Sequence, residues 1–149
     1  MRIDTKPFGE IEVDSRQRIS FPHGLFGFEH CNEFALLDSA QPPFYWLQSV
    51  EEADIAFVLI DPKFFRPDYS IDLPASELEE VELDGTDEAL IFSIVTIPED
   101  QARMTANLQG PIIINGRHRI GRQAISTNPN WRVRHFILEE LAAVRNRAC

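Results

Sequence analysis

Four potential metal ligands lie within nine residues near the N-terminus: His23, Glu29, His30 and Cys31. Imidazole, carboxylate and thiolate groups all bind zinc, but their spacing here matches no common zinc pattern. A cysteine paired with a histidine would also be a candidate nucleophile. Cys31 is as easily a small core residue, so we expect neither a metal nor a catalytic cysteine in this stretch.

Other catalytic signatures are absent from the sequence. The two glycines of GLFG, Gly24 and Gly27, lack the lysine and the following helix of a phosphate-binding loop, and no G-x-S-x-G, H-E-x-x-H or C-x-x-C occurs. Acidic residues recur near predicted strand ends: Asp54, Asp61, Asp68 and Asp72. Aspartates at such positions more often bond their own backbone in turns than transfer protons. We expect no catalytic residue and no cofactor, and favour a binding module over an enzyme.

The net charge of −10 is unevenly distributed. Residues 1–116 carry 7 basic and 22 acidic side chains, whereas residues 117–149 carry 7 basic and 2 acidic ones. An acidic body repels nucleic-acid phosphates and attracts basic protein surfaces. The alternative is that the acidity serves only solubility.

Five arginines gather in the basic part: Arg117, Arg119, Arg122, Arg132 and Arg134. The first three, on one sheet face, could contact RNA, but no aromatic stacking platform interleaves them. Arginine also forms bidentate contacts with carboxylates. We expect these side chains to pair with carboxylates of the protein itself or of a protein partner, and we expect no direct nucleic-acid binding.

The length of 149 residues suits one domain, which at this size buries about 68–70% of the surface of its unfolded chain. The longest uninterrupted apolar run, Ile55 to Ile60, is six residues, against the roughly 20 that span a bilayer. The N-terminal residues lack the apolar core of a secretory signal, and two cysteines are too few for a disulfide framework. The sequence therefore predicts a cytoplasmic protein without a membrane span.

Short apolar or alternating runs, bounded by Pro, Asp, Ser or Gly, predict a succession of β-strands. These strands are 8–13, 18–21, 34–38, 43–49, 55–62 and 89–98. Asn115-Gly116, between two further runs, predicts a two-residue type I′ hairpin. Arg117 and Arg119 would then share a strand face, and a bulge at Gly121 would place Arg122 beside them.

Two helices are expected. Ser76, followed three residues later by Glu79, predicts a short, acidic, capped helix beginning after Pro74. Near the C-terminus we favour a last strand through about Ile137 and a helix from Leu138. The fold class is mainly β: a small antiparallel barrel-like or sandwich single domain with these two helices. Residues 1–137 would form the barrel and residues 138–149 a helical tail.

Two stretches supply candidate partner contacts, because aromatic residues and methionine are enriched at interfaces, although most aromatics of a small barrel are core. The first stretch, PFYWLQS and the acids after it, offers Phe44, Trp46, Gln48, Glu51, Glu52 and Asp54. The second, MTANLQGPIIIN, offers Met104, Thr105 and Asn107. Asn107 also precedes the Gly110-Pro111 break, where its amide is expected to hold a turn.

Four strings in register resemble the signature blocks of the flagellar assembly factor FliW family. They are FPHGLFGFE (21–29), PFYWLQS (43–49), FVLIDPKFFRPDY (57–69) and MTANLQGPIIIN (104–115). The resemblance runs from about Phe8 to Arg134 and does not cover the tail after Ile137. It departs at Phe26, where the family usually has proline, and at Gly110, where alanine is common.

The resemblance implies a cytoplasmic bacterial protein with a β-barrel-like fold and no catalytic activity. Family members bind flagellin and the RNA-binding translational repressor CsrA, which they antagonise non-competitively, at a site apart from its RNA groove. The acidity would then be partly functional, because an RNA-binding partner presents basic surface; Glu51, Glu52, Asp54 and the helix acids Glu77 to Glu82 are candidates. The alternative is a ligand-binding or enzymatic barrel of unknown substrate, using Asn107 with acidic residues.

Overall fold

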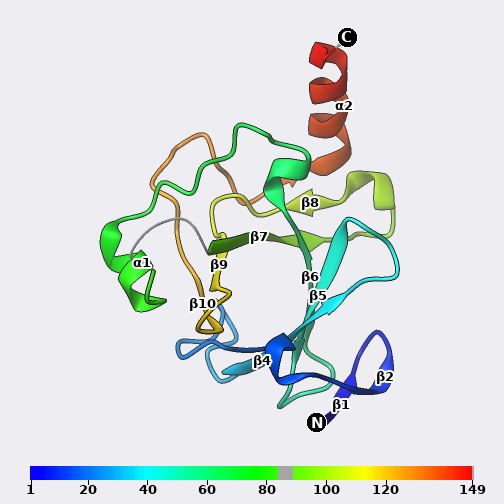
Figure 1. Ribbon diagram of the computed structural model, residues 1–149. Coiled ribbons are helices and arrows are strands. Elements are labelled where there is room, and N and C mark those ends of the chain that lie inside the picture. The colour runs from blue at the N-terminus through cyan, green and yellow to red at the C-terminus, as the bar shows by residue number, and fades with distance from the viewer. Residues whose placement is uncertain (84–88, 149) are drawn as a thin grey trace.

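The computed structural model describes residues 1–83 and 89–148 (Figure 1). Its strands are β1 (Arg2–Thr5), β2 (Gly9–Glu12), β3 (Arg18–Ser20), β4 (Glu33–Asp38), β5 (Phe44–Ser49), β6 (Ala56–Ile60), β7 (Ala89–Thr96), β8 (Thr105–Ala106), β9 (Ile112–Asn115), β10 (Ile120–Gln123) and β11 (His135–Phe136). Its α-helices are α1 (Ala75–Glu80) and α2 (Ile137–Ala148), and its 3-10 turns are η1 (Ser15–Gln17), η2 (Pro62–Phe64) and η3 (Gln101–Arg103).

Seven of these strands close into a barrel. They follow the order β7-β6-β5-β4-β3-β10-β9, and β9 pairs back onto β7. The mainly-β, barrel-like single domain with a short acidic helix and a C-terminal helix is therefore confirmed. One pair differs from the antiparallel expectation, because β10 runs parallel to β3, with Ile120 opposite Ser20. The β1–β2 hairpin forms a sheet of its own, and β8 and β11 extend the large sheet beyond β7.

The barrel interior is filled by side chains. Strand alternation turns every second residue inward, and the buried residues of this cluster are Ile19, Phe21, Leu25, Cys31, Phe34, Leu47, Leu59, Phe92, Ile112 and Ile114. The rings of Phe21 and Phe34 meet edge to face with centroids 5.2 Å apart, a favoured aromatic geometry. Among the residues that the structure describes, the barrel interior is therefore a packed, mainly apolar core.

Three apolar clusters fasten other segments to the outside of the barrel. Ile3 of the β1–β2 hairpin packs with Leu37 of β4. The residues after α1 pack on β9 and β10 through Val81. The segment after η2 and the start of α2 share a cluster that contains Phe65 and Ile137. Hydrophobic burial on both sides of the sheet therefore sets the positions of both helices.

The β9–β10 hairpin is present, but its predicted type I′ turn is wrong. Its loop has four residues, and Arg119, with φ +55°, adopts the left-handed conformation rather than Gly116. The Asn115 side chain sets this geometry: its Oδ1 accepts from the backbone N–H groups of Arg117 (3.0 Å) and His118 (3.1 Å). Arg117 and Arg119 therefore lie in the loop and not on a strand face.

The predicted bulge at Gly121 is also wrong, because the β9–β10 register is continuous from Ile120 to Gln123. Gly121 serves the core instead: a Cβ atom there would lie 2.4 Å from Cζ of the buried Phe21 ring. Arg122 bonds Glu77 of α1, as expected for an arginine that pairs with a carboxylate of the protein itself.

Helix α1 begins after Pro74 as predicted, but Ser76 and Glu79 do not cap it. Pro74 is the N-cap residue and makes no side-chain capping bond, because Ser76 already lies inside the first turn. Aspartates cap the 3-10 turns. Asp61 Oδ1, for example, accepts from the Lys63 N–H at 2.9 Å, which confirms the expectation that Asp61 forms a turn.

Helix α2 is joined to the barrel by a polar network around Glu140. The Glu140 carboxylate accepts from Arg66 Nη1 at 2.7 Å and lies 2.9 Å from Nδ1 of the buried His135. Strand β11 ends at Phe136 and α2 follows at once, one residue before the predicted helix start at Leu138. The division of the chain at residue 137 into a barrel and a tail stays a prediction.

The His135 network makes stability depend on pH. The Arg132 backbone N–H donates to His135 Nε2 at 2.9 Å, so that nitrogen is unprotonated. Burial, above all, lowers the pKa of His135 below its usual 6.5. The unfolded chain takes up this proton at about pH 6.5. As pH falls from there through the folded pKa, the free energy of unfolding should fall by up to about 1.4 kcal/mol per pH unit.

Urea unfolding at several pH values from 7.5 to 5 tests this prediction. Carboxylates titrate in the wild-type protein and in His135→Gln alike. A steeper fall of the free energy of unfolding with pH in wild type than in His135→Gln therefore measures the contribution of the histidine. Equal slopes for the two proteins would contradict it.

Candidate partner-binding surface

Three of the predicted contact residues meet on the outside of the barrel. Strand alternation puts Phe44 and Trp46 on one face of β5, and Trp46 lies opposite Val58 of β6. They line a shallow depression of about 100 Å³ together with Met104, which precedes β8, and Ile97, which follows β7. We call Phe44, Trp46, Val58, Ile97 and Met104 the Trp46 patch.

The Trp46 patch has the composition of an interface centre. Its aromatic, methionine and branched side chains are half-buried, and Ile97 is 46% exposed. Tryptophan, phenylalanine and methionine are enriched in interface cores, and residues of this kind carry most of the binding energy. Ile97 was not predicted as a contact residue from the sequence, because an apolar run such as 89–98 does not show which of its last residues lie beyond the strand.

Gln48 and Thr105 lie inside the protein. Gln48 is fully buried; its Nε2 donates to the carbonyls of Ser49 and Ala53, both at 3.0 Å, and its Oε1 accepts from the Lys6 N–H at 2.9 Å. These bonds fix the β1–β2 turn to the β5–β6 turn. Thr105 is buried in β8 opposite Phe136. Both side chains support the framework that carries the patch.

The predicted acids lie at the other end of β5 from Phe44. Glu51, Glu52 and Asp54 are exposed on the β5–β6 turn. Glu51 Oε1 accepts from the backbone N–H groups of Asn32 and Glu33, both at 2.8 Å. Because a strand rises about 3.3 Å per residue, this turn and Phe44 are separated by roughly the length of β5. The acids and the Trp46 patch are thus two neighbouring features and not one cluster.

One cluster of described residues could offer three metal ligands. The ligand atoms of His30, Cys31 and Glu52 lie within 4.8 Å of one another, with His30 Nε2 3.4 Å from Glu52 Oε2. His23 lies instead 3.3 Å from Glu80. Burial, supported by the charges of Glu52 and Glu51, raises the pKa of the Cys31 thiol. A buried, protonated thiol is a poor ligand and a poor nucleophile, so we assign neither role.

Asn107 holds the turn before Pro111, which confirms the expectation for its amide. Its Oδ1 accepts from the backbone N–H groups of Gln109 (3.1 Å) and Gly110 (2.8 Å), and its own N–H donates to the Ile94 carbonyl (3.0 Å). This turn positions Met104 and β8 against β7. A direct contact between Asn107 and a partner stays a prediction.

Substitutions of Asn107 test whether its side chain stabilises the turn before Pro111. Asn107→Ala leaves the Gly110 N–H without its acceptor and the Gln109 N–H with the Arg132 carbonyl alone, which should cost about 1–2 kcal/mol. Asn107→Asp keeps the acceptor oxygen and should cost less than half as much. Urea unfolding measures both changes. Wild-type stability in Asn107→Ala would contradict the role in the turn.

No helix among the described residues is both long and apolar enough to cross a membrane. Fold and surface define a small, closed β-barrel protein with an acidic sequence, a filled interior and a half-exposed apolar patch on the outside. A model of the family described as "FliW protein" matches residues 2–137.

Relatives that match over nearly the whole chain support the same family. "Flagellar assembly factor FliW" of Treponema denticola is 43% identical over 147 residues, covering 98% of this chain and 100% of the relative. Its counterpart in Leptospira biflexa is 48% identical over 141 residues, covering 93% and 92%. A crystal structure of the flagellar assembly factor FliW superposes with a TM-score of 0.86 at 37% identity, covering 92% of this chain and 96% of that one. The chain belongs to the FliW family of flagellar assembly factors.

Proposed function

We propose that this FliW-family protein couples flagellin synthesis to flagellum assembly by binding two proteins in the cytoplasm, a CsrA-type translational repressor and flagellin. The free protein antagonises the repressor and so releases flagellin translation. Accumulated flagellin takes up the protein and restores repression. Family membership supports a role in flagellum assembly, since the relatives are named as assembly factors and not as enzymes.

The observation that carries this proposal is the Trp46 patch on a barrel with a filled interior. Chemistry on a small molecule would need a cavity with convergent polar groups. The described residues of the barrel interior are mainly packed apolar side chains, and Asn107 is committed to backbone groups. An outward-facing cluster of Phe44, Trp46 and Met104 suits contact with another protein.

Charge favours the repressor as one partner. The chain carries 24 acidic against 14 basic side chains, and Glu51, Glu52 and Asp54 stand exposed on one turn. A surface that binds RNA must be basic, so it attracts this protein, with a strength that salt reduces. An acidic protein docked beside the RNA groove would also repel incoming phosphates, which accounts for non-competitive antagonism.

Calorimetric titration of the purified protein with the repressor and with flagellin tests the proposal. We expect a complex with each, and weaker binding to the repressor at 500 mM than at 50 mM NaCl. RNA already bound to the repressor should not prevent the protein from joining. Absence of both complexes at low salt would disprove the proposal, and displacement of the protein by RNA would disprove the non-competitive mode.

A further inference from the structure

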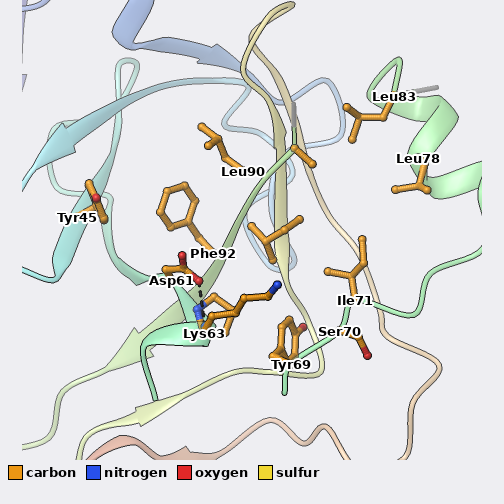
Figure 2. Close-up of a pocket in the computed structure, with 13 residues that line it drawn as sticks. Tyr45, Asp61, Lys63, Tyr69, Ser70, Ile71, Leu78, Leu83, Leu90 and Phe92 are labelled. Carbon is orange, nitrogen blue, oxygen red and sulfur yellow. Dashed lines mark hydrogen bonds between the residues drawn. The ribbon is translucent and has the colours of Figure 1, made fainter. Parts of the chain in front are cut away.

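A second surface lies beside the first half of β7, between η2 and α1 (Figure 2). It is a groove of about 550 Å³, within the range of ligand-binding cavities. Its lining includes Tyr45, Lys63, Tyr69, Leu90 and Phe92. It shares no lining residue with the depression at the Trp46 patch.

The groove exposes an open edge of β7. On one side of this strand, β9 pairs with residues 89–92 and β8 with residues 95–96. On the other side, β6 pairs with residues 93–95 only, the last pair being Ile60 opposite Ser93. Residues 89–92 therefore have no strand beside them on the groove side, among the residues that the structure describes.

Strand alternation identifies which backbone groups face the groove. The Ile94 carbonyl accepts from the Asn107 N–H on the β8 side. Successive residues of a strand direct their backbone groups to alternate edges, so Leu90 and Phe92 face β9. The N–H and C=O groups of Ala89 and Ile91 face the groove.

Pro62 explains why this edge is open. Continuing the register of Ile60 and Ser93 would place Pro62 opposite Ile91. Proline has no N–H to donate, and the Pro62 carbonyl already accepts from the N–H of Arg66 at 2.9 Å, inside the turn that begins η2. The chain leaves the sheet there, and the Ile91 groups keep no strand partner from β6.

Side chains on both sides of this edge form apolar walls. Tyr45, Phe92 and Leu90, which is 43% exposed, lie on the side of the barrel interior. Ile71 and Leu78 lie across the edge from them, as Figure 2 shows. An added strand would present its side chains alternately to these two walls.

The groove lining contains one cationic side chain, Lys63, and one carboxylate, that of Asp61, whose Oδ1 accepts from the backbone N–H of Lys63. Figure 2 shows the Lys63 side chain extending from η2 into the groove. Among the described residues its ammonium group has no ion-pair partner; only the Lys63 backbone N–H is bonded, to Asp61. A carboxylate on an incoming peptide would complement this charge.

We propose that the groove binds an extended peptide segment of a partner protein, which adds to the β7 edge as a strand. The backbone of the peptide bonds the groove-facing groups of Ala89 and Ile91, its apolar side chains contact the two walls alternately, and an acidic side chain pairs with Lys63. Strand addition of this kind takes its affinity from main-chain bonds and its specificity from alternate pockets. The inference deepens the proposed function by giving one protein partner a second contact surface.

A random 12-residue phage-displayed library tests the groove without either proposed partner. We expect selection to enrich sequences with apolar residues at alternate positions and an Asp or Glu among them. A selected peptide, made synthetically with fluorescein, then serves as the probe in anisotropy titrations. Failure to enrich any such sequence would overturn the proposal.

Matched variants locate the peptide. Leu90→Asp in the groove and Ile97→Asp in the Trp46 patch replace residues of similar exposure. Leu90→Asp and the exposed Lys63→Glu should each weaken probe binding at least tenfold, whereas Ile97→Asp should leave it unchanged. Circular dichroism checks that each variant folds, and Lys63→Glu remains informative if Leu90→Asp does not. Equal binding by Lys63→Glu and wild type would overturn the proposal.

Amide hydrogen exchange distinguishes strand addition from mere side-chain contact. Bound peptide should slow exchange at Ala89 and Ile91 at least tenfold, and leave Leu90 and Phe92 unchanged because they already bond β9. Unaltered exchange at Ile91 in the saturated complex would overturn the added strand. If these tests fail while the protein still forms complexes with the repressor and with flagellin, the peptide-binding role of the groove is wrong and the proposed function is unaffected.

Discussion

Gly121→Ala is expected to destabilise the protein by about 3 kcal/mol, at the upper end of what overpacking a core costs. The added Cβ would lie 2.4 Å from Cζ and 2.6 Å from Cε2 of Phe21. Phe21 is fully buried and stacked edge to face on Phe34, so the ring cannot rotate away without displacing its neighbours. Urea unfolding measures the loss.

A double-mutant cycle with Phe21→Leu identifies the cause. Leucine removes the ring atoms that the new methyl group would strike, so Gly121→Ala should cost at least 1 kcal/mol less in the Phe21→Leu background than in wild type. Additive effects of the two substitutions would show that the Phe21 ring is not what requires glycine at position 121.

Ile97→Asp is expected to weaken binding to at least one of the two proposed partners by about 30-fold, or roughly 2 kcal/mol. An interface that covers the Trp46 patch would bury the new carboxylate against Trp46 and Met104 without a partner, and desolvating an unpaired charge is costly. The fold should be unchanged, because Ile97 lies outside the strands and is 46% exposed. Calorimetric titration with each partner measures the effect.

Ile125→Asp is the matched control. This isoleucine is 60% exposed and lines neither the Trp46 patch nor the β7 groove. It gains the same charge and should bind both partners like wild type. If Ile97→Asp binds both partners as tightly as Ile125→Asp does, the Trp46 patch is not the contact surface.

Local sequence signals predicted most of the strands. Strands β4 to β7 begin and end within two residues of the predicted boundaries, because Pro, Asp and Ser interrupt each apolar run. The pairing of β3 with β10 was not predictable, since it joins Ser20 to Ile120 across about 100 residues and no local pattern encodes it. The turn after Asn115 was wrong for a related reason. The Asn115 amide also donates to the carbonyl of Val81 (2.9 Å), from a distant segment, and tertiary contacts override the usual preference of an Asn-Gly pair.

Residue types in the sequence identified part of the candidate surface. Whether the other candidate residues are accessible depends on burial, which only the structure shows. Phe44, Trp46 and Met104 come together because β5 alternation and the Asn107 turn place them on one face. Gln48 lies on the same strand, but its side chain is buried and donates to backbone carbonyls of the following turn. No sequence pattern predicts these bonds. The β7 groove did have a signal. A proline directly after a strand, as at Asp61-Pro62, has no N–H to donate to a neighbouring strand, and the pairing of β6 with β7 ends just before it, at Ile60.

The parallel contact between β3 and β10 sets when the protein becomes complete during its own synthesis. The barrel closes only after β9 and β10 (Ile120–Gln123) have left the ribosome, which happens after all the other barrel strands have emerged. A nascent chain that ends earlier exposes the unpaired edges of both β3 and β7, which are sites for proteolysis or mispairing. Joining segments so far apart also gives the fold a high contact order, and such topologies fold slowly. Newly made copies therefore complete the barrel late, after most of their other strands have formed.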